Sequence, residues 1–87
     1  MTYELTYSRQ ASGYLRRLDR PTQLRMRAAI DALRDEPRPH GTKQLKQAGG
    51  SRSLRVGDWR IVYFVDDDTR AVNIEIVAPR GQVYRRL

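Results

Sequence analysis

Cysteine is absent from the 87 residues, so the chain can form no disulfide, thiolate nucleophile or cysteine-ligated metal site. This suits a reducing cytoplasm, where we expect the protein to act. The one histidine, His40, stands in a Pro-Gly loop rather than on a firm scaffold. No Walker motif, zinc-ligand spacing or Ser-His-Asp arrangement is visible, and we expect no cofactor and no metal. No stretch approaches the roughly 20 apolar residues that cross a bilayer. The N-terminus has no apolar run either, so we expect no signal peptide and no membrane partner.

Acidic residues are scarce beside basic ones. Ten Asp and Glu oppose seventeen Lys and Arg, which gives a net charge of +7. Only two of the basic residues are lysines, Lys43 and Lys46. Arginine grips phosphate with a planar fork and stacks on bases, so a small basic domain points to nucleic acid or to an acidic protein partner. A GC-rich genome would also favour arginine over lysine, but it would not explain the excess of positive charge.

The first half of the chain predicts a strand followed by two helices. Residues 1–7 alternate apolar and polar, as a half-buried strand does. Ser8 can cap a helix over residues 9–18. Pro21 suits the first turn of a second helix, which carries an apolar stripe up to residue 33. Short, closely linked helices pack as an antiparallel hairpin.

The second half predicts a loop and then a three-stranded antiparallel meander. Pro and Gly mark residues 36–50 as a loop. Strands are expected at 52–56, 59–65 and 71–77, and Gly57-Asp58 suits a type II′ turn between the first two. We therefore predict one α+β domain over residues 1–87. Its N-terminal strand and helix hairpin precede the meander, the helices pack on one sheet face, and the other face is at least partly open.

Two arginines stand opposite each other in the predicted hairpin. Counting outward from Gly57-Asp58 pairs Arg55 with Arg60, on the face that also carries Ser53. Like charges directly opposite destabilise a sheet, so we expect a carboxylate or an anionic ligand nearby. The alternative is that both side chains extend into water, which screens their repulsion. A register slip of one residue would remove the pairing altogether.

The C-terminal residues add further basic and aromatic groups. Arg80, Arg85 and Arg86 could complete a phosphate-binding rim, and Tyr84 could stack on a base or move a proton. Alternatively, Tyr84 packs at the sheet edge and Arg85-Arg86 is simply a basic terminus.

Two weaker signals lie elsewhere in the chain. Lys43 and Lys46 could contact a nucleic-acid backbone or be plain surface. The consecutive acids at 66–68 are typical of a solvent-facing turn rather than of a metal site.

The order of elements, the segment LRVGDWRIVYFV and an Arg-x-x-x-Tyr after the last strand together resemble the RelE/ParE toxins of type II toxin–antitoxin systems. The resemblance covers nearly the whole chain and implies a RelE-like fold. RelE-like members cut messenger RNA in the ribosomal A site, whereas ParE-like members inhibit DNA gyrase. The resemblance implies an acidic antitoxin as partner, together with ribosome and mRNA in the RelE branch.

The residue types favour the RelE branch. The resemblance assigns catalysis to Arg55, Arg60, Arg80 and Tyr84. It assigns RNA binding to Arg52, Ser53, Lys43, Lys46, Arg85 and Arg86. Two departures from relatives stand out. Ser51 and Ser53 replace lysines of the first meander strand, and Pro79 replaces a polar or basic residue. Arg52 lies between the serines but on the opposite face.

The implied chemistry is attack of a ribose 2′-hydroxyl on the adjacent phosphate, which gives a cyclic phosphate and a free 5′-hydroxyl. Arginines stabilise the charge of the transition state, but arginine is a poor base. Arginines around a phenol lower its pKa, so Tyr84 is the expected base and Arg80 the support of the leaving group. The reaction requires no metal. The alternatives are a ParE-like gyrase inhibitor and a cleavage-impaired relic that still binds an antitoxin.

Overall fold

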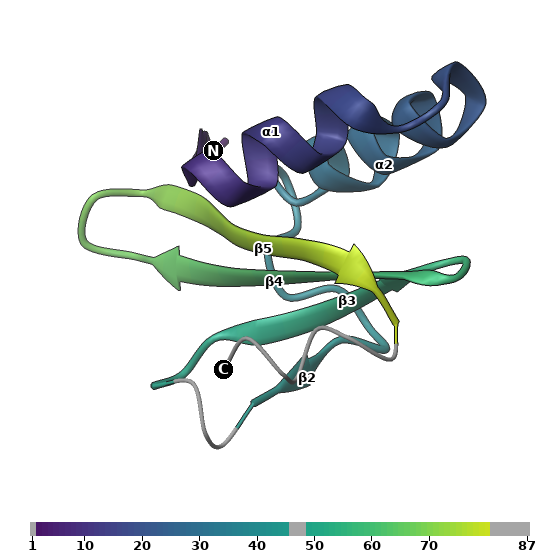
Figure 1. Ribbon diagram of the computed structural model, residues 1–87. Helices are drawn as coiled ribbons and strands as arrows, with labels where there is room; N and C mark the ends of the chain where they lie inside the picture. The colour runs from purple at the N-terminus through teal and green to yellow at the C-terminus, as the bar shows by residue number, and fades with distance from the viewer. Residues whose placement is uncertain (1, 46–48, 81–87) are drawn as a thin grey trace.

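The computed structural model describes residues 2–45 and 49–80. Both helices lie on one face of a five-stranded sheet with strand order β1-β5-β4-β3-β2, so the predicted α+β class and helix placement are confirmed (Figure 1). The elements in chain order are β1 (Glu4–Tyr7), α1 (Arg9–Arg17), α2 (Arg20–Ala32), β2 (Lys43–Gln44), β3 (Arg52–Val56), β4 (Trp59–Asp66) and β5 (Ala71–Pro79).

Each helix begins at the residue type that can cap it. Ser8 precedes α1, and its Oγ accepts a hydrogen bond from the N–H of Ala11 at 3.0 Å. Asp19 precedes α2 and accepts from the N–H of Thr22 at 3.3 Å. Hydrogen bonds from Thr22, first that of its side chain and then that of its N–H, lower the pKa of the Asp19 carboxyl. Pro21 stands in the first turn of α2, as predicted.

The edges of the sheet differ from the sequence prediction in two places. β1 begins at Glu4 and pairs in parallel with β5, next to the predicted meander. β2 forms within the segment 36–50, where we predicted only loop, so that prediction is wrong at Lys43–Gln44. A two-residue strand has no periodicity to detect. It exists because Lys43 and Gln44 pair with β3.

The core lies between the helices and one face of β4. Tyr63 is completely buried there, and its hydroxyl donates to the carbonyl oxygen of Pro37 at 2.8 Å. The buried side chains that share this core include Leu15, Met26, Ile30, Leu33, Ile61, Tyr63, Val65, Val72, Ile74 and Val77. Odd-numbered residues of β4 thus face the helices.

The β3–β4 hairpin has the predicted register. Leu54 lies opposite Ile61, and Arg55 lies opposite Arg60. Gly57 has φ +59, in the left-handed region that the first central residue of a type II′ turn requires. A Cβ at this position would also lie 2.9 Å from Nη2 of Arg25. The turn therefore needs glycine for its conformation, whereas the flexible end of the Arg25 side chain could move away from an added Cβ.

One irregularity interrupts the pairing of β4 with β5. Val62 pairs with Ile76 whereas Tyr63 pairs with Ile74, so Glu75 is an extra residue in β5. Such a β-bulge changes the direction in which nearby side chains point and is frequent beside functional sites.

Candidate functional site

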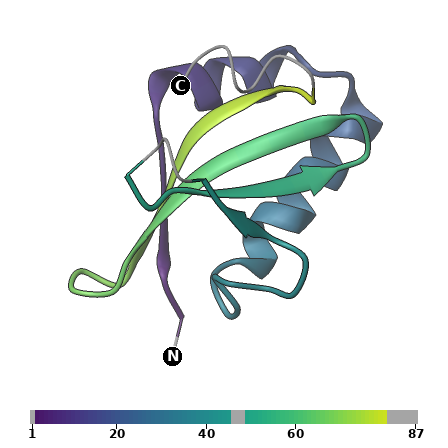
Figure 2. The same cartoon turned by 90° about the horizontal axis from the view of Figure 1, so that it is seen from below.

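The sheet face away from the helices carries the predicted basic residues. Figure 2 looks onto this face, with β2 to β5 in front of the helices. In register across the strands, Lys43 lies opposite Ser53, and Arg55 lies opposite Arg60. Residues directly opposite each other in an antiparallel pair share a face. The structure therefore brings four of the predicted site residues together; we call this surface the open face.

An apolar cluster forms the floor of the open face. Val62 and Ala78 are fully buried there, and Leu45 and Ile76 pack against them. Leu45 is thus the aliphatic anchor that follows β2. The cluster gives the basic side chains above it a firm, low-dielectric base.

The two opposed arginines have few partners. Nε of Arg55 donates to the carbonyl oxygen of Gly57 at 3.1 Å. Nη1 of Arg60 lies 3.5 Å from Oγ of Ser53, while Nε of Arg60 is buried with no hydrogen-bond partner. Among the described residues, no carboxylate forms an ion pair with either guanidinium. We expected either a carboxylate or an anionic ligand to offset the repulsion between the two arginines. No described carboxylate does so, which leaves an anionic ligand as the candidate. Water screens the charge of the exposed Arg55.

Arg80 lies at the same end of the sheet. It stands one residue past β5, and its N–H donates to the carbonyl oxygen of Asp58 in the β3–β4 turn at 2.8 Å. This bond holds the backbone of Arg80 beside the hairpin that carries Arg55 and Arg60. Four other predicted site residues lie outside the described residues: Lys46, Tyr84, Arg85 and Arg86.

Arg52 is separated from the other site residues. It lies opposite Tyr63, on the helix side of the sheet, and its Nη2 donates to Oγ1 of Thr42 at 3.1 Å. Pro79, opposite Trp59, is on that side too, so its replacement of a polar residue leaves the open face unchanged.

The serines at the positions where the resemblance led us to expect lysines are buried, with 3% of Ser51 and 2% of Ser53 exposed. Ser53 accepts from Arg60, so it supports that guanidinium instead of offering an exposed contact to RNA. Ser51 Oγ donates to Oε1 of Glu75 at 2.6 Å.

Glu75 is the functional candidate that sequence reasoning missed. Strict alternation from Val72 and Ile74 would lead to a buried residue at 76, yet the buried residue is Val77. That break comes after Glu75 and marks a bulge. Alternation in the segment VNIEIV already places Glu75 on the face away from Val72 and Ile74, but no carboxylate was among the predicted site residues.

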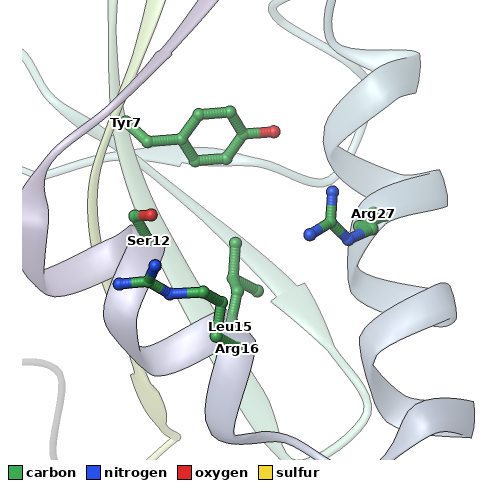
Figure 3. Close-up of a pocket in the computed structure, with 5 residues that line it drawn as sticks. All are labelled: Tyr7, Ser12, Leu15, Arg16 and Arg27. Atoms are coloured by element: carbon green, nitrogen blue, oxygen red, sulfur yellow. The ribbon is translucent and has the colours of Figure 1, made fainter.

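A second concave region lies on the helix side. It is a pocket of about 180 Å³ lined by Tyr7, Ser12, Leu15, Arg16 and Arg27. Figure 3 shows the Tyr7 hydroxyl directed toward α2, from which Arg27 extends back. Burial, helped by the negative charge of Asp31, raises the pKa of Tyr7 against the opposing effect of Arg27 and Arg34. The hydroxyl therefore stays protonated, and no lining residue is a ready proton acceptor.

No three His, Cys, Asp or Glu side chains cluster as metal ligands within residues 2–45 and 49–80. In the same part of the chain, neither helix is long and apolar enough to cross a membrane.

The order of elements and the basic open face agree with the result of a comparison to known protein families. The family model described as ParE toxin of type II toxin-antitoxin system, parDE, matches residues 5–84. The chain belongs to this toxin family. It is therefore a toxin of a type II toxin–antitoxin system, within the RelE/ParE superfamily. No curated protein sequence matches the chain.

Solved structures similar to this toxin are RelE proteins. The archaeal RelE–RelB complex from Pyrococcus horikoshii matches with a TM-score of 0.82 and 27% identity, over 95% of this chain and 100% of that chain. The toxin–antitoxin complex RelBE2 from Mycobacterium tuberculosis matches with a TM-score of 0.79 and 27% identity, over 92% and 100% of the two chains. The isolated E. coli RelE toxin matches with a TM-score of 0.78 over 97% and 93%, but at 20% identity it shows the fold alone.

Proposed function

We propose that this toxin is an endoribonuclease that cuts messenger RNA in the ribosomal A site. The opposed pair Arg55 and Arg60 carries the proposal, because no described carboxylate offsets it and Nε of Arg60 is buried without an acceptor. Leaving a buried donor unsatisfied costs about 1–3 kcal/mol. A phosphodiester bound at the open face would offset the like-charge repulsion and supply acceptors.

The chemistry follows from the residue types. The ribose 2′-oxygen attacks the neighbouring phosphorus, and the bond to the 5′-oxygen of the next nucleotide breaks. Arg55 and Arg60 bind the non-bridging oxygens and stabilise the charge that grows on them in the transition state. Arg80, held beside the same hairpin, supports the leaving oxygen. In this proposal Tyr84 is the proton-transfer group that the resemblance predicts, and the products are a cyclic phosphate and a 5′-hydroxyl end.

The proposal also includes a protein partner. The two similar structures at 27% identity are RelE toxins bound to RelB antitoxins. We propose that a cognate acidic antitoxin folds on binding and covers the open face, and that the free toxin acts on cytoplasmic ribosomes and mRNA. An acidic chain is the natural complement of a surface that presents Lys43, Arg55, Arg60 and Arg80.

The test uses purified toxin and ribosomes programmed with a defined mRNA. The wild type should cut in the A-site codon and leave a 2′,3′-cyclic phosphate, and Arg60→Ala should lower the single-turnover rate by about 100-fold or more. Arg38→Ala, at the opposite end of the sheet, is the matched arginine control and should retain the wild-type rate. Intact A-site mRNA with the wild-type toxin would refute the proposal.

A second function is inhibition of DNA gyrase, which is favoured by the match to the ParE family model. It predicts that the purified toxin blocks supercoiling by gyrase and that Tyr84→Phe has no effect. A relic that binds its antitoxin without harming growth is the third possibility. Induction in cells followed by mapping of mRNA ends separates all three.

A further inference from the structure

We propose that Glu75 is the general base that removes the 2′-proton during cleavage. This inference rests on the proposed endoribonuclease activity and assigns to it a catalytic residue from the open face. No residue of β5 itself was among the sequence-predicted site residues.

Glu75 follows the buried Ile74 and so points to the open face, and the β-bulge places Ile76 on that face as well and returns Val77 to the core. Val62 pairs with Ile76, and the next residue of β4 pairs with Ile74, so Glu75 is unpaired between them. The side chain is exposed, and it reaches Ser51 on the open-face side of the sheet. A regular strand could not direct a carboxylate there without moving Val77 out of the core.

A buried serine fixes the carboxylate. Oγ of Ser51 donates to Oε1 of Glu75 at 2.6 Å, and only 3% of Ser51 is exposed. No other hydrogen bond to the Glu75 side chain occurs within residues 2–45 and 49–80. Oε1 is thus occupied, and Oε2 remains to accept a proton from a substrate.

The second buried serine holds the phosphate-binding group. Ser53 Oγ lies 3.5 Å from Nη1 of Arg60. Residues two apart on an extended chain are roughly 7 Å apart. The two serines therefore hold the carboxylate and the guanidinium at neighbouring same-face positions of the chain. In this proposal the carboxylate faces the 2′-hydroxyl, and the guanidinium faces the adjacent phosphate.

Position separates Glu75 from Asp66, the acid at the far end of β4. Oδ1 of Asp66 accepts from the N–H groups of Asp68 and Thr69 in the β4–β5 turn, at 3.0 and 3.2 Å, so this carboxylate belongs to that turn. Arginine cannot serve as the base because it does not deprotonate in proteins. Glu75, held by Ser51 two residues before the serine that contacts Arg60, is therefore the carboxylate we assign as the base.

The step balances with Glu75 as acceptor. Oε2 takes the 2′-proton, the 2′-oxygen forms its bond to phosphorus, and the bond from phosphorus to the 5′-oxygen breaks. The electron pair stays on the 5′-oxygen, which takes a proton from water, and the hydroxide that this leaves takes the proton from Glu75. The base of the reaction is thus a carboxylate.

The test compares Glu75→Gln with wild type on programmed ribosomes. The amide oxygen of glutamine still accepts from Ser51 but cannot take a proton, so cleavage should fall by about 100-fold or more. Binding to ribosomes that carry a 2′-deoxy A-site codon should be equal or tighter, because a negative charge beside the phosphate is gone. Asp68→Asn, which removes an exposed turn carboxylate, is the matched control and should leave both quantities unchanged.

A pH profile separates a base from a merely structural residue. The wild-type single-turnover rate should decrease as the pH falls. Glu75→Gln should not show this decrease and should keep the wild-type melting temperature. Ser51→Ala should lower the rate several-fold at every pH and still show the decrease at low pH. The role of Glu75 would be overturned if Glu75→Gln cleaved within about threefold of the rate of an active wild type. It would also be overturned if the substitution reduced ribosome binding and cleavage equally. An inactive wild type would instead refute the proposed function, and the role of Glu75 with it.

Discussion

The two ends of the sheet handle positive charge in opposite ways. At the β4–β5 turn, Asp67 accepts from Nη2 of Arg38 at 2.8 Å and from the hydroxyl of Tyr3 at 2.7 Å. The guanidinium of Arg70 lies 4.5 Å from the centre of the Tyr3 ring. Each cation at this end has a partner that the fold supplies, so we call it the paired end.

At the β3–β4 turn, the arginines have no such partners. Arg55, Arg60 and Arg80 meet no carboxylate within ion-pair distance in the described part of the chain. We call this the unpaired end. The two ends thus differ in whether the described part of the fold supplies partners for its arginines. In the proposed function, the unpaired end is where an RNA phosphate binds.

The largest expected effect comes from making the unpaired end resemble the paired one. Arg55→Glu places a carboxylate opposite Arg60, which replaces like-charge repulsion by a cross-strand ion pair worth about 0.2–1 kcal/mol. We expect a slightly higher melting temperature together with loss of mRNA cleavage by about 100-fold or more. Thermal unfolding and the ribosome assay measure the two. A variant that is stabilised and still cleaves would show that the unpaired charge has no catalytic use.

The two turns also differ in how they tolerate side chains at positive φ. Gly57 has φ +59 at the unpaired end, and Arg70 has φ +58 at the paired end. Gly57→Ala should destabilise the fold by about 1–2 kcal/mol, since the added Cβ also approaches Arg25.

Arg70→Gly is the matched change at the other turn. It relieves the backbone strain but loses the contact with the Tyr3 ring, so its net effect on stability should be under about 1 kcal/mol. Urea unfolding of both variants measures the contrast. Equal destabilisation by the two substitutions would contradict it.

A smaller effect is expected from the serine beneath Arg60. Ser53→Ala removes an acceptor that lies 3.5 Å from Nη1, a distance at which hydrogen bonds are weak. Cleavage should fall only several-fold, through a higher KM, because the charge of Arg60 remains. A loss as large as that of Arg60→Ala would mean that Ser53 acts directly on the substrate.

The smallest expected effect concerns Asp67, the exposed carboxylate of the paired end. The hydrogen bonds from Arg38 and then Tyr3 lower the pKa of Asp67 in the folded protein. The folded state therefore binds fewer protons there than the unfolded state. The stabilisation is present above the unfolded value of about 3.9 and is lost as pH falls through the lower folded value.

Asp67→Asn should accordingly lower the melting temperature slightly at neutral pH. The difference from wild type should disappear as the pH falls below about 4. Cleavage should be unaffected, as this residue lies away from the open face. A melting-temperature difference between Asp67→Asn and wild type that grows as the pH falls would contradict the lowered pKa of Asp67 as its cause.

Much of the fold was predictable because its signals are local. Alternation fixed the faces of β4, and Gly57-Asp58 fixed the pairing of Arg55 with Arg60. β2 was not predictable, since Lys43 and Gln44 become a strand only by pairing with β3.

The part of the candidate site that follows from the register of the β3–β4 hairpin was predictable from the sequence. Glu75 was missed although alternation with Val72 and Ile74 places it on the open face, because the predicted site consisted of basic residues, a serine and a tyrosine and named no carboxylate. The burial of Ser51 and Ser53 also required the tertiary structure, since serine alone signals neither a core nor a surface position. The predicted roles of Tyr84, Arg85 and Arg86 stay predictions.

The most direct test of the unpaired end is a map of where RNA binds. The guanidinium Nε–H signals of the toxin can be followed by NMR while a short RNA with a 2′-deoxy substitution at the scissile position is added. Arg55, Arg60 and Arg80 should shift, and Arg38 and Arg70 should not. Shifts at the paired end, or at Arg16 and Arg27 of the helix-side pocket, with Arg60 unchanged, would contradict the assignment of the open face as the RNA site.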